Sequence, residues 1–102
     1  MITHCVFIRY RAEANDGTRD DIYKALHALR PRVPGLTNII IAANSSPEGL
    51  DKGFSEGFIV TFRDAKARDA YLADSEHAKV GAMIVAAAEG GIDGILVYDL
   101  EH

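Results

Sequence analysis

Four short segments of this 102-residue chain carry apolar side chains at adjacent positions, and this feature constrains the fold most. The adjacent pairs are Val6 and Phe7, Ile40 and Ile41, Ile59 and Val60, and Leu96 and Val97. Successive side chains of a strand point to opposite faces of the sheet, so a sheet with one face in water alternates apolar with polar residues. We therefore expect a sheet that is buried on both faces, although short apolar strands can show this pattern by chance.

The same segments are expected to form the strands. Residues 4–11 alternate with a period of two, and 36–43 contains the β-branched run Ile39-Ile40-Ile41. Residues 57–62 and 95–100 are the third and fourth strands. The polar segment 44–53 contains Gly and Pro and predicts a loop. The 44–56 loop either contacts a second subunit or forms a mobile lid over a pocket on the helix side of the sheet.

One surface helix is expected between the first two strands. Its apolar stripe recurs at i, i+3, i+4 and i+7: Ile22, Ala25, Leu26 and Leu29. Asn15-Asp16-Gly17 predicts a turn before it, and Thr18 with Asp21 predicts an approximate capping box. Pro31 and Pro34-Gly35 are expected to end it.

Two further helices are expected between residues 64 and 90. Asp64 is predicted to cap the first helix and Ser75 the second, and Gly90-Gly91 is expected to end the second. The order β-α-β-β-α(α)-β is the split βαβ pattern of a ferredoxin-like α+β domain with an antiparallel sheet, and we assign it to residues 1–102 as one domain. Because helices would cover one sheet face, we expect a second copy to cover the other and form a homodimeric α+β barrel.

Composition excludes several function classes. The formal net charge of −4 and the absence of Lys/Arg runs argue against nucleic acid and anionic membrane as partners. Cys5 has no second cysteine, the first residues are not expected to be a signal peptide, and a cytoplasmic location is predicted. No metal-ligand spacing, phosphate loop or Gly-x-Ser-x-Gly motif is present, so neither metal nor cofactor is predicted. We give His102 no weight, because the last three residues are native or belong to an expression tag.

The stretch AYLADSEH places Tyr71 and His77 six residues apart. On one unbroken helix these residues would point about 120° away from each other. Asp74-Ser75 allows one helix to end and another to begin, and only such a break brings the two rings together. The alternative is ordinary packing at a helix junction, with the tyrosine ring buried and its hydroxyl in water.

Topology brings a second pair of residues together. In a ferredoxin-like sheet the first strand lies antiparallel to the last, so His4 and Asp99 are expected at the same edge of the sheet. The alternative is that His4 bonds to a backbone group and that Asp99 is a surface residue of an edge strand.

A set of motifs spaced along the chain resembles one known family. The motifs are His4, Pro34-Gly35-Leu36, residues 44–50, Gly53-Phe54, Phe62-Arg63-Asp64, Asp69-Ala70-Tyr71-Leu72 and His77. Together they resemble the stress-responsive dimeric α+β barrel (Dabb) family from His4 to Asp99. The resemblance implies a ferredoxin-like subunit whose sheet pairs with that of a second copy in a homodimeric barrel.

Some members of that family are polyketide cyclases similar to olivetolic acid cyclase. The resemblance implies that His77 is the base and that Tyr71, His4 and Asp99 surround it in a helix-side pocket. Asp99 would then hold the tautomer of His77, and Tyr71 would donate to a developing enolate. The cyclases' pocket tyrosine on the first helix falls at Leu26 here. The expected function is cofactor-free cyclisation or isomerisation of a small keto compound. The alternatives are a stress-protective structural dimer and a protein that binds a small apolar ligand.

Overall fold

The computed structural model describes residues 1–102 as four strands, three α-helices and two short 3₁₀ helices. In chain order the elements are β1 (Ile2–Ile8), α1 (Asp16–Leu29), η1 (Arg30–Arg32), β2 (Leu36–Ala43), β3 (Glu56–Phe62), α2 (Ala65–Ala73), α3 (Ser75–Ala87), η2 (Gly91–Gly94) and β4 (Ile95–Glu101). The number of strands and the break between α2 and α3 agree with the sequence prediction. The first strand was predicted at residues 4–11, but it ends at Ile8, because the backbone of residues 9–11 leaves the sheet and bonds to Gly94 and to Ala87 instead. None of the helices combines the length and the apolar character needed to cross a bilayer.

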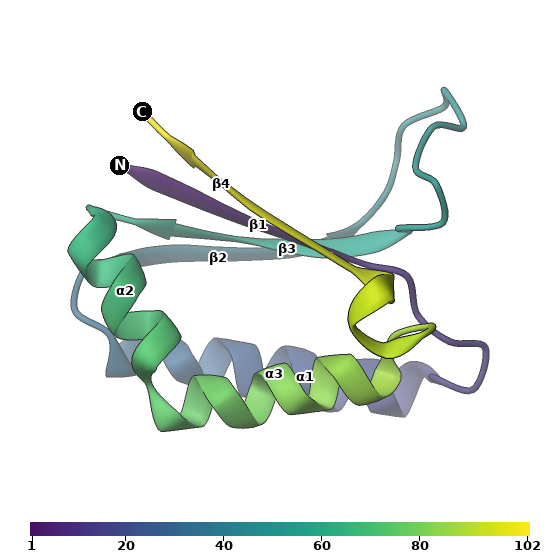
Figure 1. The fold of residues 1–102 in the computed structure, drawn as a ribbon, viewed down its shortest axis with the longest axis horizontal. Coiled ribbons are helices and arrows are strands. Elements are labelled where there is room, and N and C mark those ends of the chain that lie inside the picture. Colours follow the sequence, from purple (N-terminus) through teal and green to yellow (C-terminus); the bar gives the residue numbers. More distant parts are fainter.

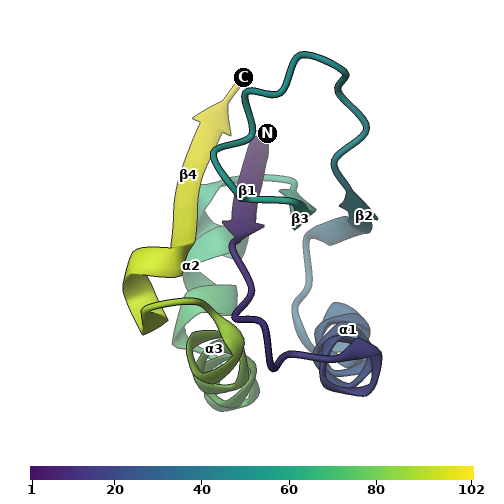
Figure 2. The same ribbon diagram turned by 90° about the vertical axis from the view of Figure 1, so that its right-hand side faces the viewer.

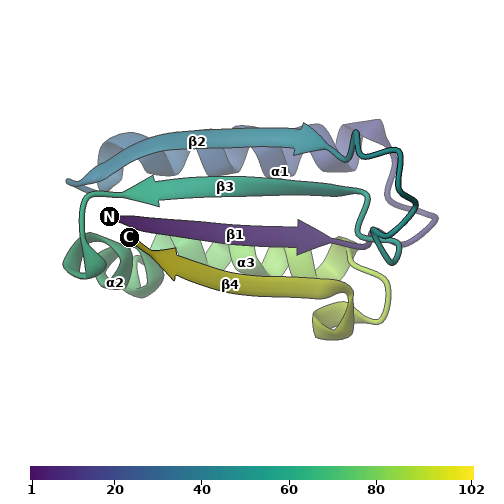
Figure 3. The same ribbon diagram turned by 90° about the horizontal axis from the view of Figure 1, so that it is seen from above.

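The strands form one antiparallel sheet in the order β2-β3-β1-β4 (Figure 3). The first and last strands are therefore neighbours, and His4 lies directly opposite both Val60 and Asp99. This is the ferredoxin-like α+β fold that the element order predicted.

The helices cover a single face of the sheet, with α1 and α3 side by side beneath it and α2 at one end (Figures 1 and 3). The core lies between the two layers, because alternate strand residues point toward the helices. Its largest fully buried side chains are Tyr71, Phe62, Ile8, Ile22, Leu26, Leu29 and Val60. The apolar stripe predicted for α1 is the face that meets this core.

The helix caps differ from the sequence prediction in two places. Asn15, not Thr18, caps α1, since its side-chain oxygen accepts the Thr18 backbone N–H at 2.9 Å. Asp74, not Ser75, caps α3, and it accepts the Glu76 N–H at 2.7 Å. In both cases a side-chain carbonyl or carboxylate one to three residues earlier reaches the free N–H groups first. Asp64 caps α2 as predicted.

The opposite face of the sheet has no helix over it (Figure 1). Ile40 keeps 53% of its surface exposed there, so within the single chain the triple-isoleucine run is buried only in part. A hollow of about 450 Å³ lies on this face, and Phe7, Ile40, Leu50, Phe54 and Leu96 are among its lining residues. The sheet face that no helix covers is therefore apolar and concave.

The long loop 44–55 rises from the sheet on the side away from the helices (Figure 2). It joins the ends of β2 and β3 near Glu56, which lies opposite Ile8, whereas His4 lies toward the other end of β1. The alternative that this loop is a lid over a helix-side pocket near His4 is therefore wrong. Its position beside the open hollow leaves the predicted contact with a second subunit as the remaining interpretation.

Candidate functional site

The helix break at Asp74 brings Tyr71 and His77 together. Tyr71 lies in the last turn of α2 and His77 in the first turn of α3. Their ring centroids are 4.4 Å apart, and the angle between the ring planes is 54°. Arg32 of η1 binds the Asp74 carboxylate with Nε 3.1 Å from Oδ2 and Nη2 3.1 Å from Oδ1. The junction is thus fixed both by a cap and by a two-point ion pair. The sequence prediction that a break unites the two rings is confirmed.

The sheet supplies the other two residues of the cluster. His4 of β1 is 4% exposed, and its Nδ1 lies 2.6 Å from Asp99 Oδ1 on β4. Asp99 is a direct register partner of His4, as the topology predicted. A carboxylate can only accept, so His4 Nδ1 carries the proton and donates it.

Aromatic contacts join the two halves into one cluster. The His4 ring meets the Tyr71 ring edge-on at 5.8 Å, and Phe62 packs against Tyr71 at 5.1 Å. His4, Tyr71 and His77 therefore form a contiguous row from the sheet to α3. All four residues predicted for the site lie in this one cluster, which we call the His4–His77 cluster.

Three polar groups in the cluster have no hydrogen-bond partner within the chain. They are His4 Nε2, the Tyr71 hydroxyl and the ring nitrogens of His77. Among the side-chain nitrogen and oxygen atoms of the chain, only Arg9 Nε is both fully buried and without a hydrogen bond. Because the three cluster groups also lack hydrogen bonds, none of them can be fully buried. Each therefore keeps some contact with solvent, even though Tyr71 as a whole is only 1% exposed. Unpaired polar atoms gathered in one cluster are a feature expected of a binding or reaction site.

Burial shifts the pKa values of His77 and Tyr71. It lowers the pKa of His77 below its ordinary value of 6.5, and the nearby His4 lowers it further, while Asp74 acts in the opposite direction. Burial also raises the pKa of Tyr71 to about 12. At neutral pH the imidazole of His77 is therefore able to accept a proton and the phenol of Tyr71 is able to donate a hydrogen bond.

Asp99 is held as a carboxylate by its neighbours. Burial alone would raise its pKa, but the hydrogen bonds from Arg68 and His4 outweigh this and keep the pKa below 3.8. The Arg68 Nη1 donates to Asp99 Oδ2 at 2.8 Å. The two carboxylate oxygens are thus taken by Arg68 and His4.

This arrangement corrects one sequence prediction. Asp99 was expected to hold the tautomer of His77, but it binds His4 instead. The reason is geometric: Asp99 is the register partner of His4, whereas His77 reaches the cluster from α3, behind the Tyr71 ring. Two hollows of the structure lie away from the cluster: one is on the open sheet face and one, of about 200 Å³, is lined by residues of α1 and α3 such as Thr18 and Met83. Neither of them is the helix-side pocket that the sequence predicted around the cluster, where the rings pack against one another and against Phe62.

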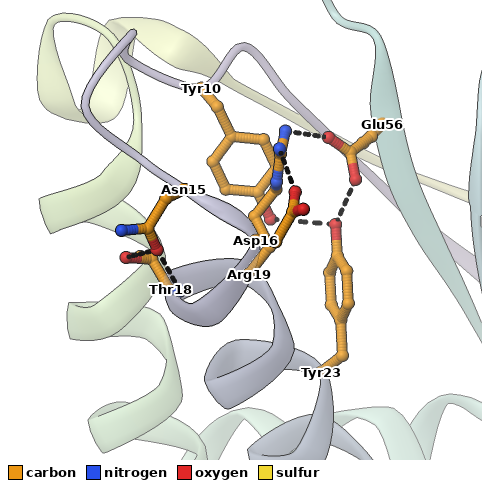
Figure 4. A network of polar contacts seen from close by, with 7 residues as sticks. All are labelled: Tyr10, Asn15, Asp16, Thr18, Arg19, Tyr23 and Glu56. Carbon is orange, nitrogen blue, oxygen red and sulfur yellow. Dashed lines mark hydrogen bonds and ion pairs between the residues drawn. The ribbon is translucent and has the colours of Figure 1, made fainter.

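Sequence reasoning missed Arg68 and a second polar network (Figure 4). In that network the Tyr10 hydroxyl donates to the Tyr23 hydroxyl at 3.3 Å, and Tyr23 donates to Glu56 at 2.7 Å. Arg19 also donates to Glu56 at 2.7 Å. The network closes the end of the layer interface farthest from His4. The position of Arg68 near the cluster could have been predicted from its spacing, because it lies three residues before Tyr71 and therefore on the same side of α2.

Groups of three or more His, Cys, Asp or Glu placed to hold a metal ion are absent from the structure. The cluster offers two imidazoles and one carboxylate, but the carboxylate is already bound by Arg68 and His4.

The model of the stress responsive A/B barrel domain, Dabb, matches residues 2–102. The chain belongs to the Dabb family. No curated protein matches this Dabb sequence. One similar solved structure is a dimeric ferredoxin-like protein of unknown function from Jannaschia sp. CCS1. It is 35% identical, with a TM-score of 0.92 and coverage of 99% of this chain and 98% of that one.

Two more distant structures share the fold of this chain. The hydroxynitrile lyase from Passiflora edulis is 19% identical, with a TM-score of 0.84 and coverage of 97% and 90% of the two chains. SnoaB, a cofactor-independent oxygenase from Streptomyces nogalater, is 14% identical, with a TM-score of 0.76 and coverage of 99% and 91%. At these identities the likeness concerns the fold alone.

Proposed function

We propose that this Dabb protein is a cofactor-independent enzyme that moves a proton at a carbon beside a carbonyl group, in a cyclisation or an isomerisation. The observation that supports this most is the convergence of unpaired, solvent-accessible groups on His4, Tyr71 and His77. The likeness to a fold that also carries a cofactor-independent oxygenase fits the proposal.

In this mechanism His77 is the general base. Its lowered pKa leaves the ring neutral at pH 7, so that a ring nitrogen without a partner can take a proton from the carbon acid. Tyr71 donates a hydrogen bond to the enolate oxygen as charge develops there. His4, held by Asp99 through its Nδ1 proton, presents Nε2 as an acceptor and orients a hydroxyl of the substrate by accepting its hydrogen bond. Because the hollows of about 450 Å³ and 200 Å³ both lie away from the cluster, we expect a small keto substrate.

The test is a panel of small 1-oxo and polyketide-like substrates with wild type, His77→Ala and Tyr71→Phe. Loss of the base is expected to lower turnover by about 10²–10⁴-fold. Loss of the phenol is expected to lower kcat by about 10²–10³-fold, with little change in Tm because the hydroxyl has no partner in the chain. His27→Ala is the matched control, since His27 is exposed on α1. Equal turnover in wild type and His77→Ala rules out the proposed base.

The assembly that we propose is a homodimer through the open sheet face. Its support is the apolar character of that face and the description of similar structures from Jannaschia sp. CCS1 and Thermobifida fusca as dimeric. Light scattering should give about twice the 11.1 kDa mass of one chain. The concave apolar hollow on this face favours a second candidate function, a dimer that binds a small apolar ligand without chemistry. Such a protein would bind ligand equally well in wild type and His77→Ala.

A further inference from the structure

Arg68 joins the helix layer to the His4–Asp99 pair. It lies on α2 one turn before Tyr71, and its side chain is 24% exposed. Nη1 donates to Asp99 Oδ2 at 2.8 Å, and Nε donates to the neighbouring Asp69 Oδ1 at 2.8 Å. The guanidinium group is thus held by two hydrogen bonds, which restrict its rotation.

The bond from Arg68 determines what Asp99 can do. With Oδ2 occupied, the carboxylate cannot rotate toward another donor without losing the hydrogen bond from Arg68 Nη1, and its Oδ1 remains aimed at His4. Because Oδ1 can only accept, the proton of a neutral His4 ring stays on Nδ1. Nε2, which has no hydrogen-bond partner within the chain, is then the acceptor of the ring.

We infer that Arg68 is a positioning residue, which fixes Asp99 and through it the tautomer and orientation of His4. The role of Arg68 in the reaction rests on the proposed function. The effect of Arg68 on the His4 ring does not. The chain of contacts runs Arg68, Asp99, His4, and then by ring contact to Tyr71. It gives the site an oriented acceptor on the sheet side, opposite His77 on the helix side.

The test uses ¹⁵N NMR of the histidine rings and ¹³C NMR of the Asp99 carboxyl in wild type, Arg68→Met and Arg68→Gln. Lys66→Met is the matched control, because it removes the same charge from an exposed position of α2. Wild type and control should show His4 protonated on Nδ1. Both Arg68 variants should show a mixture of His4 tautomers, and Asp99 should titrate at higher pH than in wild type, because the hydrogen bond from Arg68 that lowers its pKa is lost. On an active substrate, kcat should fall by about 10- to 100-fold with a smaller change in KM.

Two results separate this inference from the proposed function. A His4 tautomer and an Asp99 titration that are unchanged in both Arg68 variants overturn the inference, whatever happens to turnover. An altered His4 spectrum in a protein whose wild type turns over no substrate rejects the proposed function and supports the positioning role. Arg68→Gln carries the test if Arg68→Met does not fold, since Met and Gln both suit a helix.

Discussion

Replacing Leu96 on the open sheet face is expected to weaken the dimer by an amount that the structure sets. Full burial of a leucine side chain is worth about 1.5–3 kcal/mol. Leu96 is 44% exposed in the single chain, so covering that share contributes about 0.7–1.3 kcal/mol per copy. A twofold interface counts it twice, which gives about 1.3–2.6 kcal/mol. Leu96→Asp should therefore raise Kd by about 10- to 80-fold, and a carboxylate buried without a partner adds to this.

The assay is sedimentation velocity over a dilution series that spans the dissociation of the dimer. Ile92→Asp is the matched control, because Ile92 is 74% exposed on η2, outside the sheet, and the substitution changes the charge equally. The control should keep the wild-type Kd. The reasoning fails if both variants dissociate to the same extent, or if Leu96→Asp remains as tight a dimer as wild type.

Two more predictions concern the polar groups. The kcat/KM of wild type should rise with pH through the pKa of His77, with a midpoint below 6.5, because the base must be deprotonated and burial lowers that pKa; a midpoint above 7 contradicts the assignment of the base. Tyr23→Phe removes the bond to Glu56 and the acceptor for Tyr10. It should cost about 1–2 kcal/mol, read by calorimetry as a Tm lower by about 4–16 °C, and an unchanged Tm would show that the network adds no stability.

The strands and their order followed from the sequence because periodicity reports burial directly. The caps did not, because Asn15, Thr18, Asp74 and Ser75 can all accept from a helix N-terminus. Which one does so depends on the backbone angle just before the helix: Asn15 and Asp74 have extended backbone there. Composition near a helix start thus predicts that a cap exists and leaves its position open within a few residues.

The site was predictable to the same degree. Strand topology alone brought His4 beside Asp99, and the helix break alone allowed Tyr71 to meet His77. The partner of Asp99 was missed because it depends on where α2 directs a long side chain. Arg68 takes one carboxylate oxygen of Asp99 and His4 takes the other.

The two surfaces on which the proposals depend lie on opposite faces of the sheet. His4 and Asp99 point toward the helices, whereas Phe7 and Leu96 line the hollow on the open face. Every contact within the His4–His77 cluster is therefore made inside one subunit. Dissociation of the dimer removes no side chain from the cluster and can affect it only through the stability of the sheet. A monomeric Leu96→Asp chain that stays folded should thus keep the His4 tautomer of the wild type, since Arg68 and Asp99 remain in place.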